Sequence, residues 1–181
     1  MVKTNVFSFL DVKKAFYKES DHSISIQLRR FAARDLIFRL KKGLYCFDPK
    51  DIDEMVLAGI IAPDSYISLE SALNYYGMIP DIPLEITSVC VGYGKKAQTT
   101  VGVFRYHKIA KKLFWGYEAV ASPKEGFYNL AQKEKALLDF FYLRKIKTVS
   151  DLRLDLRDFN FQKYKKFLKF YPKWVGKIKL P

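Results

Sequence analysis

The pattern of apolar and polar positions is most informative over residues 23–34. Ile24, Leu28 and Phe31 recur at the spacing of one helical face, which predicts a helix with these three side chains turned inward. Side chains that can contact phosphates or base edges recur on the opposite side: Ser23, Gln27, Arg30 and Arg34. The segment therefore predicts an amphipathic helix with a basic face.

After this helix the pattern changes to that of a basic hairpin. Residues 36–40 and 44–47 are strand-like, and Lys41-Lys42-Gly43 between them predicts a turn in which Gly43 supplies a positive φ. Arg39, Lys41 and Lys42 would lie on this hairpin, where they could reach phosphates. A helix followed by such a hairpin is the order of parts in a winged helix-turn-helix, although an ordinary solvated helix and hairpin give the same pattern.

Residues 7–17 predict a shorter helix before the basic one. Ser8 is its candidate N-cap, and Ser20 or Asp21 would cap the following helix. The residues expected to face inward are Leu10, Ala15 and Phe16, with Lys13, Lys14 and Lys18 outward. A winged helix usually has one more helix before these two, and residues 1–6 are too few to supply it unless they contribute a strand.

The rest of the chain predicts a mixture of helices and strands, which places the protein in the α+β class. A short helix follows the Asp48-Pro49 turn and is limited by Gly59 and Pro63. We expect a domain boundary at this turn. Residues 1–48 would then form a winged-helix domain, and residues 49–181 would form an α/β domain that ends in a basic helical segment.

Three further segments have distinct patterns. Residues 66–80 predict a helix that Ser68 caps and that Gly77 ends in the left-handed conformation. Residues 84–107 read as strands around a turn over Gly92-Tyr93-Gly94-Lys95-Lys96. Residues 134–145 predict a helix that is apolar around most of its girth and therefore buried on several sides.

The last segment carries an aromatic stripe at helical spacing, surrounded by lysines. The stripe is made of Phe161, Tyr164, Phe167, Leu168 and Tyr171, and the lysines are Lys163, Lys165, Lys166 and Lys169. We expect the stripe to pack against the body of the protein. The lysines remain free for non-specific contacts, with DNA and an anionic membrane surface as the two alternatives.

The charge of the chain is concentrated at its two ends. The total is +13; residues 1–47 hold 10 basic and 4 acidic residues, and residues 145–181 hold 11 and 3. Between them, 11 basic residues are balanced by 12 acidic ones. Localised basic patches favour a polyanionic partner, with nucleic acid as the first candidate.

Composition and length indicate a folded protein that lies away from membranes. A hydrophobic content of 49% is too high for a disordered basic tail. No apolar run is long enough to span a bilayer, and the N-terminus lacks the pattern of a signal peptide. Cys46 and Cys90 lie far apart in apolar segments, which predicts buried thiols of a cytoplasmic protein and neither a disulfide nor a metal pair.

Motifs for catalysis are weak or incomplete, so we expect neither catalytic residues, nor a metal, nor a cofactor. Gly92 and Gly94 do not have the spacing of a phosphate-binding loop. Asp51 and Asp53 lack the upstream Gly-Ser element of nucleotidyltransferases and are better explained as a cluster at a helix start. A restriction-type nuclease would need a lysine two residues after Glu85, downstream of Asp81, but that position is a threonine.

Four segments in order resemble the AbiEi-type antitoxins, transcriptional regulators of bacterial abortive-infection toxin–antitoxin systems. They are KGLY at 42–45, YISLESALNYYGMIP at 66–80, TSV at 87–89 and EKALLD at 134–139. The resemblance runs from about residue 8 to residue 144. It implies a winged-helix DNA-binding end and a second α/β domain that counteracts a nucleotidyltransferase-like toxin in phage defence.

Carried onto this chain, the resemblance implies a set of DNA-contacting residues on the helix and on the wing. They are Ser23, Ser25, Gln27, Arg29, Arg30, Arg34, Arg39, Lys41 and Lys42. The implied partners are the double-stranded DNA of the chain's own operator and a cognate toxin. Such systems are classed as type IV, in which the toxin need not be bound physically. The oligomeric state stays open, and a dimer is compatible with the sequence.

The alternative function is a protein-interaction module that binds a toxin or another partner directly, without specific DNA recognition. Its anchors would be the aromatic residues of the middle region: Tyr75, Tyr76, Phe114, Trp115 and Tyr117. Interfaces favour such side chains. The same residues are equally compatible with a hydrophobic core.

Overall fold

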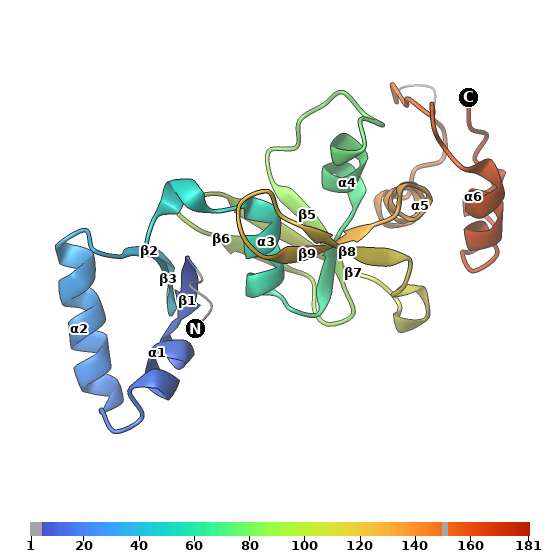
Figure 1. The fold of residues 1–181 in the computed structure, drawn as a ribbon. Coiled ribbons are helices and arrows are strands. Elements are labelled where there is room, and N and C mark those ends of the chain that lie inside the picture. The colour runs from blue at the N-terminus through green and yellow to red at the C-terminus, as the bar shows by residue number, and fades with distance from the viewer. Residues whose placement is uncertain (1–4, 150–151) are drawn as a thin grey trace.

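The structure is a computed structural model that describes residues 5–149 and 152–181. It is an α+β protein with a three-stranded sheet near the N-terminus and a six-stranded sheet in the centre (Figure 1). Helices flank both sheets, and the C-terminal segment lies at the end of the molecule opposite the N-terminal helices. Within the described residues, no helix is long and apolar enough to cross a membrane.

The N-terminal unit has the element order strand, helix, helix, strand, strand. Its elements are β1 (Val6–Ser8), α1 (Phe9–Ala15), α2 (Asp21–Ala33), β2 (Phe38–Lys41) and β3 (Leu44–Cys46). The strands pair antiparallel in the order β1-β3-β2. The strand expected from residues 1–6 is found as β1 two residues later, with Val6 as the one residue in common, and residues 1–4 lie outside the described residues.

The starts of both N-terminal helices follow from local hydrogen bonds. Ser8 caps α1 in a capping box, because its Oγ accepts the Asp11 N–H and the Asp11 carboxylate accepts the Ser8 N–H at 2.8 Å. The Ser8 hydroxyl also donates to the Asp11 carboxylate at 2.7 Å, and this bond, followed by that of the Ser8 N–H, lowers the pKa of Asp11. Ser20 caps α2, since its Oγ accepts the Ser23 N–H at 3.0 Å. Of the two candidates for the second cap, Ser20 is the one used.

The predicted inward faces of these two helices were wrong in part. Leu10 and Phe16 are 64% and 60% exposed, Ala15 is also exposed, and Phe31 is 42% exposed. The small core is instead built on Ile24 and Leu28 of α2 together with Ile37, and Phe9 and Val12 of α1 pack against it. The reason is that one side of α1 and α2 is open, and Phe16 and Phe31 border a hollow of about 420 Å³ there.

The hairpin after α2 is tighter than predicted. Lys41 is the last residue of β2, so the turn consists of Lys42 and Gly43 alone, and Gly43 has a φ of 76°. A two-residue hairpin turn needs this positive φ, which glycine adopts without steric cost. The pairing register shifts between Arg39 and Lys41, as at a β-bulge.

The central sheet has the strand order β6-β7-β5-β4-β9-β8. Its strands are β4 (Ser65–Ile67), β5 (Ile86–Cys90), β6 (Lys95–Gln98), β7 (Val103–Lys108), β8 (Tyr117–Ala121) and β9 (Phe127–Ala131). The pairs β5–β7 and β4–β9 are parallel, and the other neighbours are antiparallel. The predicted turn over residues 92–96 was too long, because Lys95 and Lys96 belong to β6.

Four helices accompany this sheet. They are α3 (Glu54–Ile61), α4 (Leu69–Tyr75), α5 (Lys133–Arg144) and α6 (Phe161–Leu168), with short 3₁₀ turns at Pro49–Asp51, Lys111–Leu113 and Val175–Lys177. Asp53 caps α3 through the Met55 and Val56 N–H groups, in agreement with an acidic helix start. Gly77 ends α4 with a φ of 67°, as predicted.

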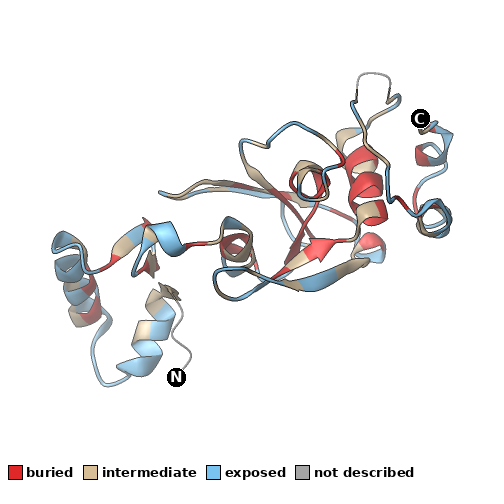
Figure 2. Cartoon of the chain, turned by 45° about the horizontal axis from the view of Figure 1, so that its top comes forward, coloured by how far each residue is buried: buried red, intermediate tan, exposed pale blue. Residues whose placement is uncertain are grey.

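The main core is continuous from the N-terminal hairpin to the C-terminal segment (Figure 2). Leu40, Leu44 and Cys46 of the hairpin belong to the same buried cluster as Leu57 of α3. The Thr100 N–H also donates to the Leu40 carbonyl at 3.2 Å. The N-terminal sheet therefore shares its inner face with the central sheet.

The two cysteines are unpaired, buried thiols, as predicted. Burial, with a smaller contribution from the Asp48 charge, raises the pKa of Cys46 to about 11. Burial likewise raises the pKa of Cys90. Thiols held in this protonated form are poor nucleophiles, so neither is placed for thiolate chemistry.

The predicted burial of α5 is confirmed, and it includes two charged side chains. Lys135 and Asp139 lie one turn apart, both fully buried, and form an ion pair. The Asp139 carboxylate accepts hydrogen bonds from the hydroxyls of Tyr66 at 2.9 Å, Ser68 at 3.0 Å and Tyr171 at 2.6 Å. Lys135 Nζ also donates to the Tyr66 hydroxyl at 2.8 Å. Three segments that are distant in sequence, around residues 66–68, 135–139 and 171, thus meet at one carboxylate.

The ion pair also explains why Ser68 does not cap α4 as predicted. Ser68 occupies the N-cap position of α4, but its side chain makes no capping bond, because the hydroxyl points to Asp139 instead. Burial and the Asp139 charge raise the pKa values of Tyr66 and Tyr171, so both hydroxyls remain protonated donors. Burial lowers the pKa of Lys135, and the Asp139 charge opposes this shift.

The prediction that the C-terminal stripe packs against the body is confirmed in part, because Phe161 is 45% exposed. Tyr164 and Tyr171 are buried, and α6 lies against α5. Glu134 anchors the start of α6, because its carboxylate accepts the Asn160 N–H at 3.2 Å and faces Lys163 Nζ at 3.4 Å. Lys165, Lys166 and Lys169 remain exposed.

We expect the two buried tyrosines of this segment to respond differently to loss of the hydroxyl. Tyr171→Phe should lower the free energy of unfolding by roughly 1.5–3 kcal/mol, because it removes a hydrogen bond to a buried charge. The matched control is Tyr164→Phe. The Tyr164 hydroxyl is buried with no hydrogen-bond partner in the described structure, so its loss should cost under about 0.5 kcal/mol. Chemical denaturation measures both, and equal losses would contradict the role given to Asp139.

Candidate nucleic-acid interface

Helix α2 is held in place by a small apolar core and presents its other sides to solvent. Ile24 and Leu28 pack with Ile37, which leads into β2, and Phe7 and Tyr45 of the sheet lie against this cluster. The base of the hairpin is therefore fixed to the buried face of α2. A rigid support of this kind lowers the cost of ordering the exposed side chains on a ligand.

The predicted arginines of this helix are exposed and unpaired. Arg29, Arg30 and Arg34 are all solvent-exposed. Among the ion pairs and side-chain hydrogen bonds of the described residues, none involves these three guanidinium groups. Each therefore keeps its five N–H donors free for an anionic partner such as phosphate or for the edge of a guanine.

The hairpin that follows α2 in sequence adds three more cations. Arg39 and Lys42 are exposed, and Lys41 is half-buried. The Arg39 Nε–H donates to the Lys41 carbonyl at 3.4 Å, a long bond that leaves the rest of the guanidinium free. The structure brings these residues to one short hairpin, as the sequence predicts.

The polar residues at the start of α2 are engaged locally. Ser23 Oγ lies 3.0 Å from Ser20 Oγ, and Ser25 Oγ donates to the Asp21 carbonyl at 2.7 Å. Ser23 and Gln27 also border the open hollow beside Phe31, although the sequence pattern placed them opposite that residue. The free basic groups are thus concentrated in the second half of the helix and on the hairpin.

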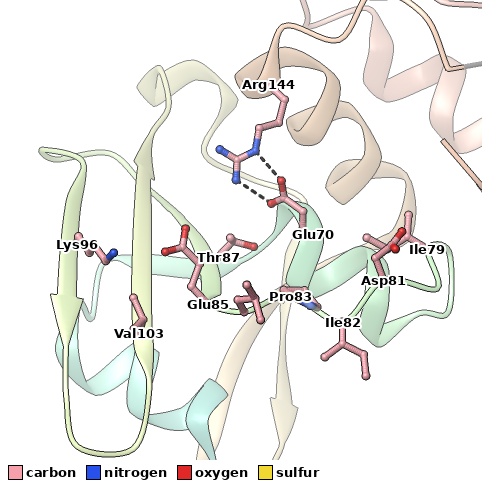
Figure 3. Close-up of a pocket in the computed structure, with 11 residues that line it drawn as sticks. Glu70, Ile79, Asp81, Ile82, Pro83, Glu85, Thr87, Lys96, Val103 and Arg144 are labelled. Atoms are coloured by element: carbon pink, nitrogen blue, oxygen red, sulfur yellow. Dashed lines mark hydrogen bonds and ion pairs between the residues drawn. The ribbon is translucent and has the colours of Figure 1, made fainter. Parts of the chain in front are cut away.

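A second hollow lies on the central sheet and collects the carboxylates that the nuclease hypothesis considered (Figure 3). It has a volume of about 530 Å³, and Asp81, Glu85 and Thr87 line it. Glu85 is paired with Arg105 at 3.0 Å, and Thr87 donates to the Ser68 carbonyl at 2.8 Å. Glu85 and Thr87 are therefore already engaged by neighbouring groups.

A bidentate ion pair closes one side of that hollow. Arg144 Nε and Nη2 donate to the two Glu70 oxygens at 2.6 and 2.9 Å (Figure 3). This pairing raises the pKa of Arg144 and joins the end of α5 to the start of α4. In the described part of the chain, no three His, Cys, Asp or Glu side chains are grouped so as to hold a metal ion.

The two histidines occupy different environments. His22 is exposed at the start of α2, and His107 is half-buried on β7. Burial, then the charge of Arg144, lowers the pKa of His107. Its buried Nε2 has no hydrogen-bond partner within the residues described.

The aromatic residues of the middle region are mostly packed inside the molecule. Phe114 and Tyr117 stack around the buried Tyr66, with ring centroids 5.2 and 4.7 Å from it. Trp115 packs edge-on against Phe167 of α6, with centroids 4.8 Å apart. Tyr76 donates its hydroxyl to the Ala131 carbonyl at 3.0 Å, and Tyr75 alone of the five is exposed.

One cationic surface was not singled out from the sequence. Lys108, Lys145 and Lys147 surround a hollow that Tyr142 and Trp174 also line. The residues that line it come from the end of β7, the end of α5 and the C-terminal segment, so no spacing rule in the sequence joins them. The excess of basic residues after position 144 was the one signal that pointed to this end of the chain.

Comparison with known proteins does not place the chain in a family. No protein-family model matches it, and no curated protein matches it at a significant level. The function must therefore be inferred from the residues and their arrangement.

Because Arg30 contacts no charged neighbour, we expect Arg30→Ala to change the free energy of unfolding by less than about 0.5 kcal/mol. Ile24→Ala on the buried face of the same helix should cost roughly 2–5 kcal/mol. Chemical denaturation of both variants tests the assignment of the two faces. A large loss for Arg30→Ala would mean that this side chain supports the fold.

Proposed function

We propose that the protein is a DNA-binding transcriptional autoregulator and the antitoxin of a toxin–antitoxin pair, with α2 as recognition helix and the β2–β3 hairpin as wing. The observation that carries the DNA-binding part is the group of three exposed, unpaired arginines on a capped helix: Arg29, Arg30 and Arg34. Helix α2 is followed directly by the cationic hairpin, which is the order of parts in a winged helix.

The length of α2 and the charge of the hairpin both suit a DNA groove. Thirteen residues of helix are long enough to cross a major groove, whose width of about 12 Å admits one α-helix. We assign to the hairpin cations the role of contacting the phosphates that flank the groove. Arginines supply both phosphate contacts and bidentate recognition of guanine, so the helix can give sequence preference while Lys41 and Lys42 give affinity.

The antitoxin part of the proposal rests on the resemblance of four ordered segments to the AbiEi-type antitoxins. Three of those segments take part in the architecture of the central sheet: 66–80 supplies β4 and α4, 87–89 lies in β5, and 134–139 lies in α5. The toxin would be a nucleotidyltransferase-like protein that this chain counteracts without needing a stable complex. We assign the effect on the toxin to the central sheet, so that α2 remains free to bind DNA.

The first test is a binding titration of the full chain against the DNA upstream of its own gene, beside a scrambled duplex, at two salt concentrations. We expect tighter and salt-sensitive binding to the upstream DNA, since each phosphate contact releases counterions. Arg30→Ala and Arg34→Ala should each cost roughly 1–3 kcal/mol of binding and reduce sequence preference. Lys41→Ala should weaken all sequences alike and lower the salt slope by about 1.

Lys111→Ala is the matched control for that titration. Lys111 is an exposed cation beside the central sheet, outside α2 and the hairpin, so its removal should leave operator binding unchanged. Equal affinity of the wild-type chain for both duplexes, or an unchanged affinity in Arg30→Ala and Arg34→Ala, would overturn the recognition-helix assignment.

The second test separates the two roles in cells that express the toxin from an independent promoter. The double variant R30A/R34A should still relieve growth arrest, because toxin neutralisation is assigned to the central sheet and not to operator binding. Growth is the measurement, with the wild-type chain and an empty vector as references. Rescue by the wild-type chain but not by R30A/R34A would show that the antitoxin effect depends on DNA binding.

A further inference from the structure

We propose that the C-terminal end of the molecule carries a second nucleic-acid site, which binds single-stranded nucleic acid by stacking a base in an aromatic and cationic hollow. The hollow has a volume of about 450 Å³ and is lined by Lys108, Tyr142, Leu143, Lys145, Lys147 and Trp174. The end of α5 and the C-terminal segment, which contribute residues to it, lie at the end of the molecule opposite α2 (Figure 1). The proposal therefore stands independently of the recognition helix.

The aromatic part of the hollow is a supported platform. Trp174 is 37% exposed, and its ring lies nearly parallel to that of Tyr142, with an interplanar angle of 25° and centroids 6.2 Å apart. Tyr142 in turn packs edge-on against Tyr171, whose hydroxyl is bonded to Asp139. The indole is thus oriented by a chain of contacts that begins at the buried ion pair, so little order has to be gained when a base stacks on it.

The cationic part comes from two elements that end at the same place. Lys108 is the last residue of β7, and Lys145 is the left-handed C-cap of α5, with Lys147 two residues later. Within the described residues none of these lysines forms an ion pair, and no acidic side chain lines the hollow. Lys108 Nζ lies 5.6 Å from the centre of the Tyr93 ring, and the three ammonium groups, which have no acidic partner among the described residues, suit phosphates on either side of a stacked base.

The surroundings reinforce the same sign of charge. Residues 145–181 hold 11 basic and 3 acidic side chains, and Lys165, Lys166, Lys169 and Lys173 are exposed on this end. Such a field attracts any polyanion and raises its rate of association. The hollow adds the selectivity that diffuse charge lacks.

Single-stranded nucleic acid fits this site better than a duplex or an anionic membrane surface does. The bases of a duplex are stacked on each other, so their faces are closed to Trp174, whereas an unpaired base offers its face freely. A membrane surface would be met by protruding apolar side chains above a basic face, but here Tyr142 and Trp174 line a depression. An unpaired stretch of RNA or single-stranded DNA is therefore the ligand that we assign.

The test uses the full chain and labelled 12-nucleotide strands of RNA and DNA of one sequence, with the matching duplex and phosphatidylserine vesicles as competitors. Fluorescence anisotropy measures affinity. K145A/K147A should weaken single-strand binding by about tenfold or more, since two phosphate contacts are lost. K165A/K166A removes the same charge outside the hollow and should change it by less than about threefold.

The aromatic contribution is tested at Trp174. Trp174→Ala should weaken single-strand binding by about tenfold, and Trp174→Phe should retain most of it, because the stacking face is kept. R30A/R34A should leave this binding unchanged, which separates the site from the operator-binding proposal. Thermal unfolding midpoints establish that the variants are folded; if Trp174→Ala unfolds, K145A/K147A against K165A/K166A decides.

Equal losses in K145A/K147A and K165A/K166A would overturn the proposal in favour of diffuse charge. Duplex or vesicles that compete as well as the unlabelled strand would overturn the assignment of the ligand. If RNA and DNA strands bind with equal affinity, the site contacts only the base and the phosphate of each nucleotide. A preference for RNA would add a contact to the 2′-hydroxyl within the same site.

Discussion

The buried ion pair of Lys135 and Asp139 is the constraint around which the central part of the molecule is arranged. A buried carboxylate is costly unless it is paired and its remaining lone pairs are bonded. Here the partners come from β4, from the start of α4, from α5 and from the C-terminal segment. Each of these elements must be in place for the charge to be satisfied, so the pair specifies their mutual arrangement.

The same constraint reaches both proposed surfaces through packing. Ser68 gives up its capping role to bond Asp139, and α4 still begins there because Leu69 and the residues after it are buried. Tyr171 links the ion pair to Tyr142 and from there to Trp174. At the other end of the core, Leu40 and Cys46 bring the β2–β3 hairpin into contact with the central sheet. The hairpin and the C-terminal hollow thus share one interior, whereas α2 rests on its own small core.

Local sequence patterns were sufficient to predict features that depend on a single helix or hairpin. The buried girth of α5, the glycine that ends α4, the cap at Ser8 and the order of α2 and the hairpin were predicted from spacing and composition, because they depend on neighbours within a few residues. The exposed arginines of α2 were also found in this way. A helix places residues three and four apart on the same side whatever surrounds it.

Contacts between distant segments could not be predicted in this way. Phe31 has the spacing of a core residue, yet it borders an open hollow because nothing among the described residues covers that side of α1 and α2. Lys135 and Asp139 look like an ordinary exposed pair one turn apart, and only the fold shows that they are enclosed. Lys108 and Trp174 meet at one hollow although 66 positions separate them, a proximity that no short motif encodes.

The sharing of one interior by the hairpin and the central sheet limits how modular the N-terminal unit can be. The separate core of this unit contains three buried apolar residues among those described: Ile24, Leu28 and Ile37. Its inner strand face is completed by residues from the larger part of the chain. The N-terminal unit therefore cannot be exchanged between proteins on its own: substitutions on the exposed side of α2 stay local, whereas substitutions in β2 and β3 reach the core of the whole molecule.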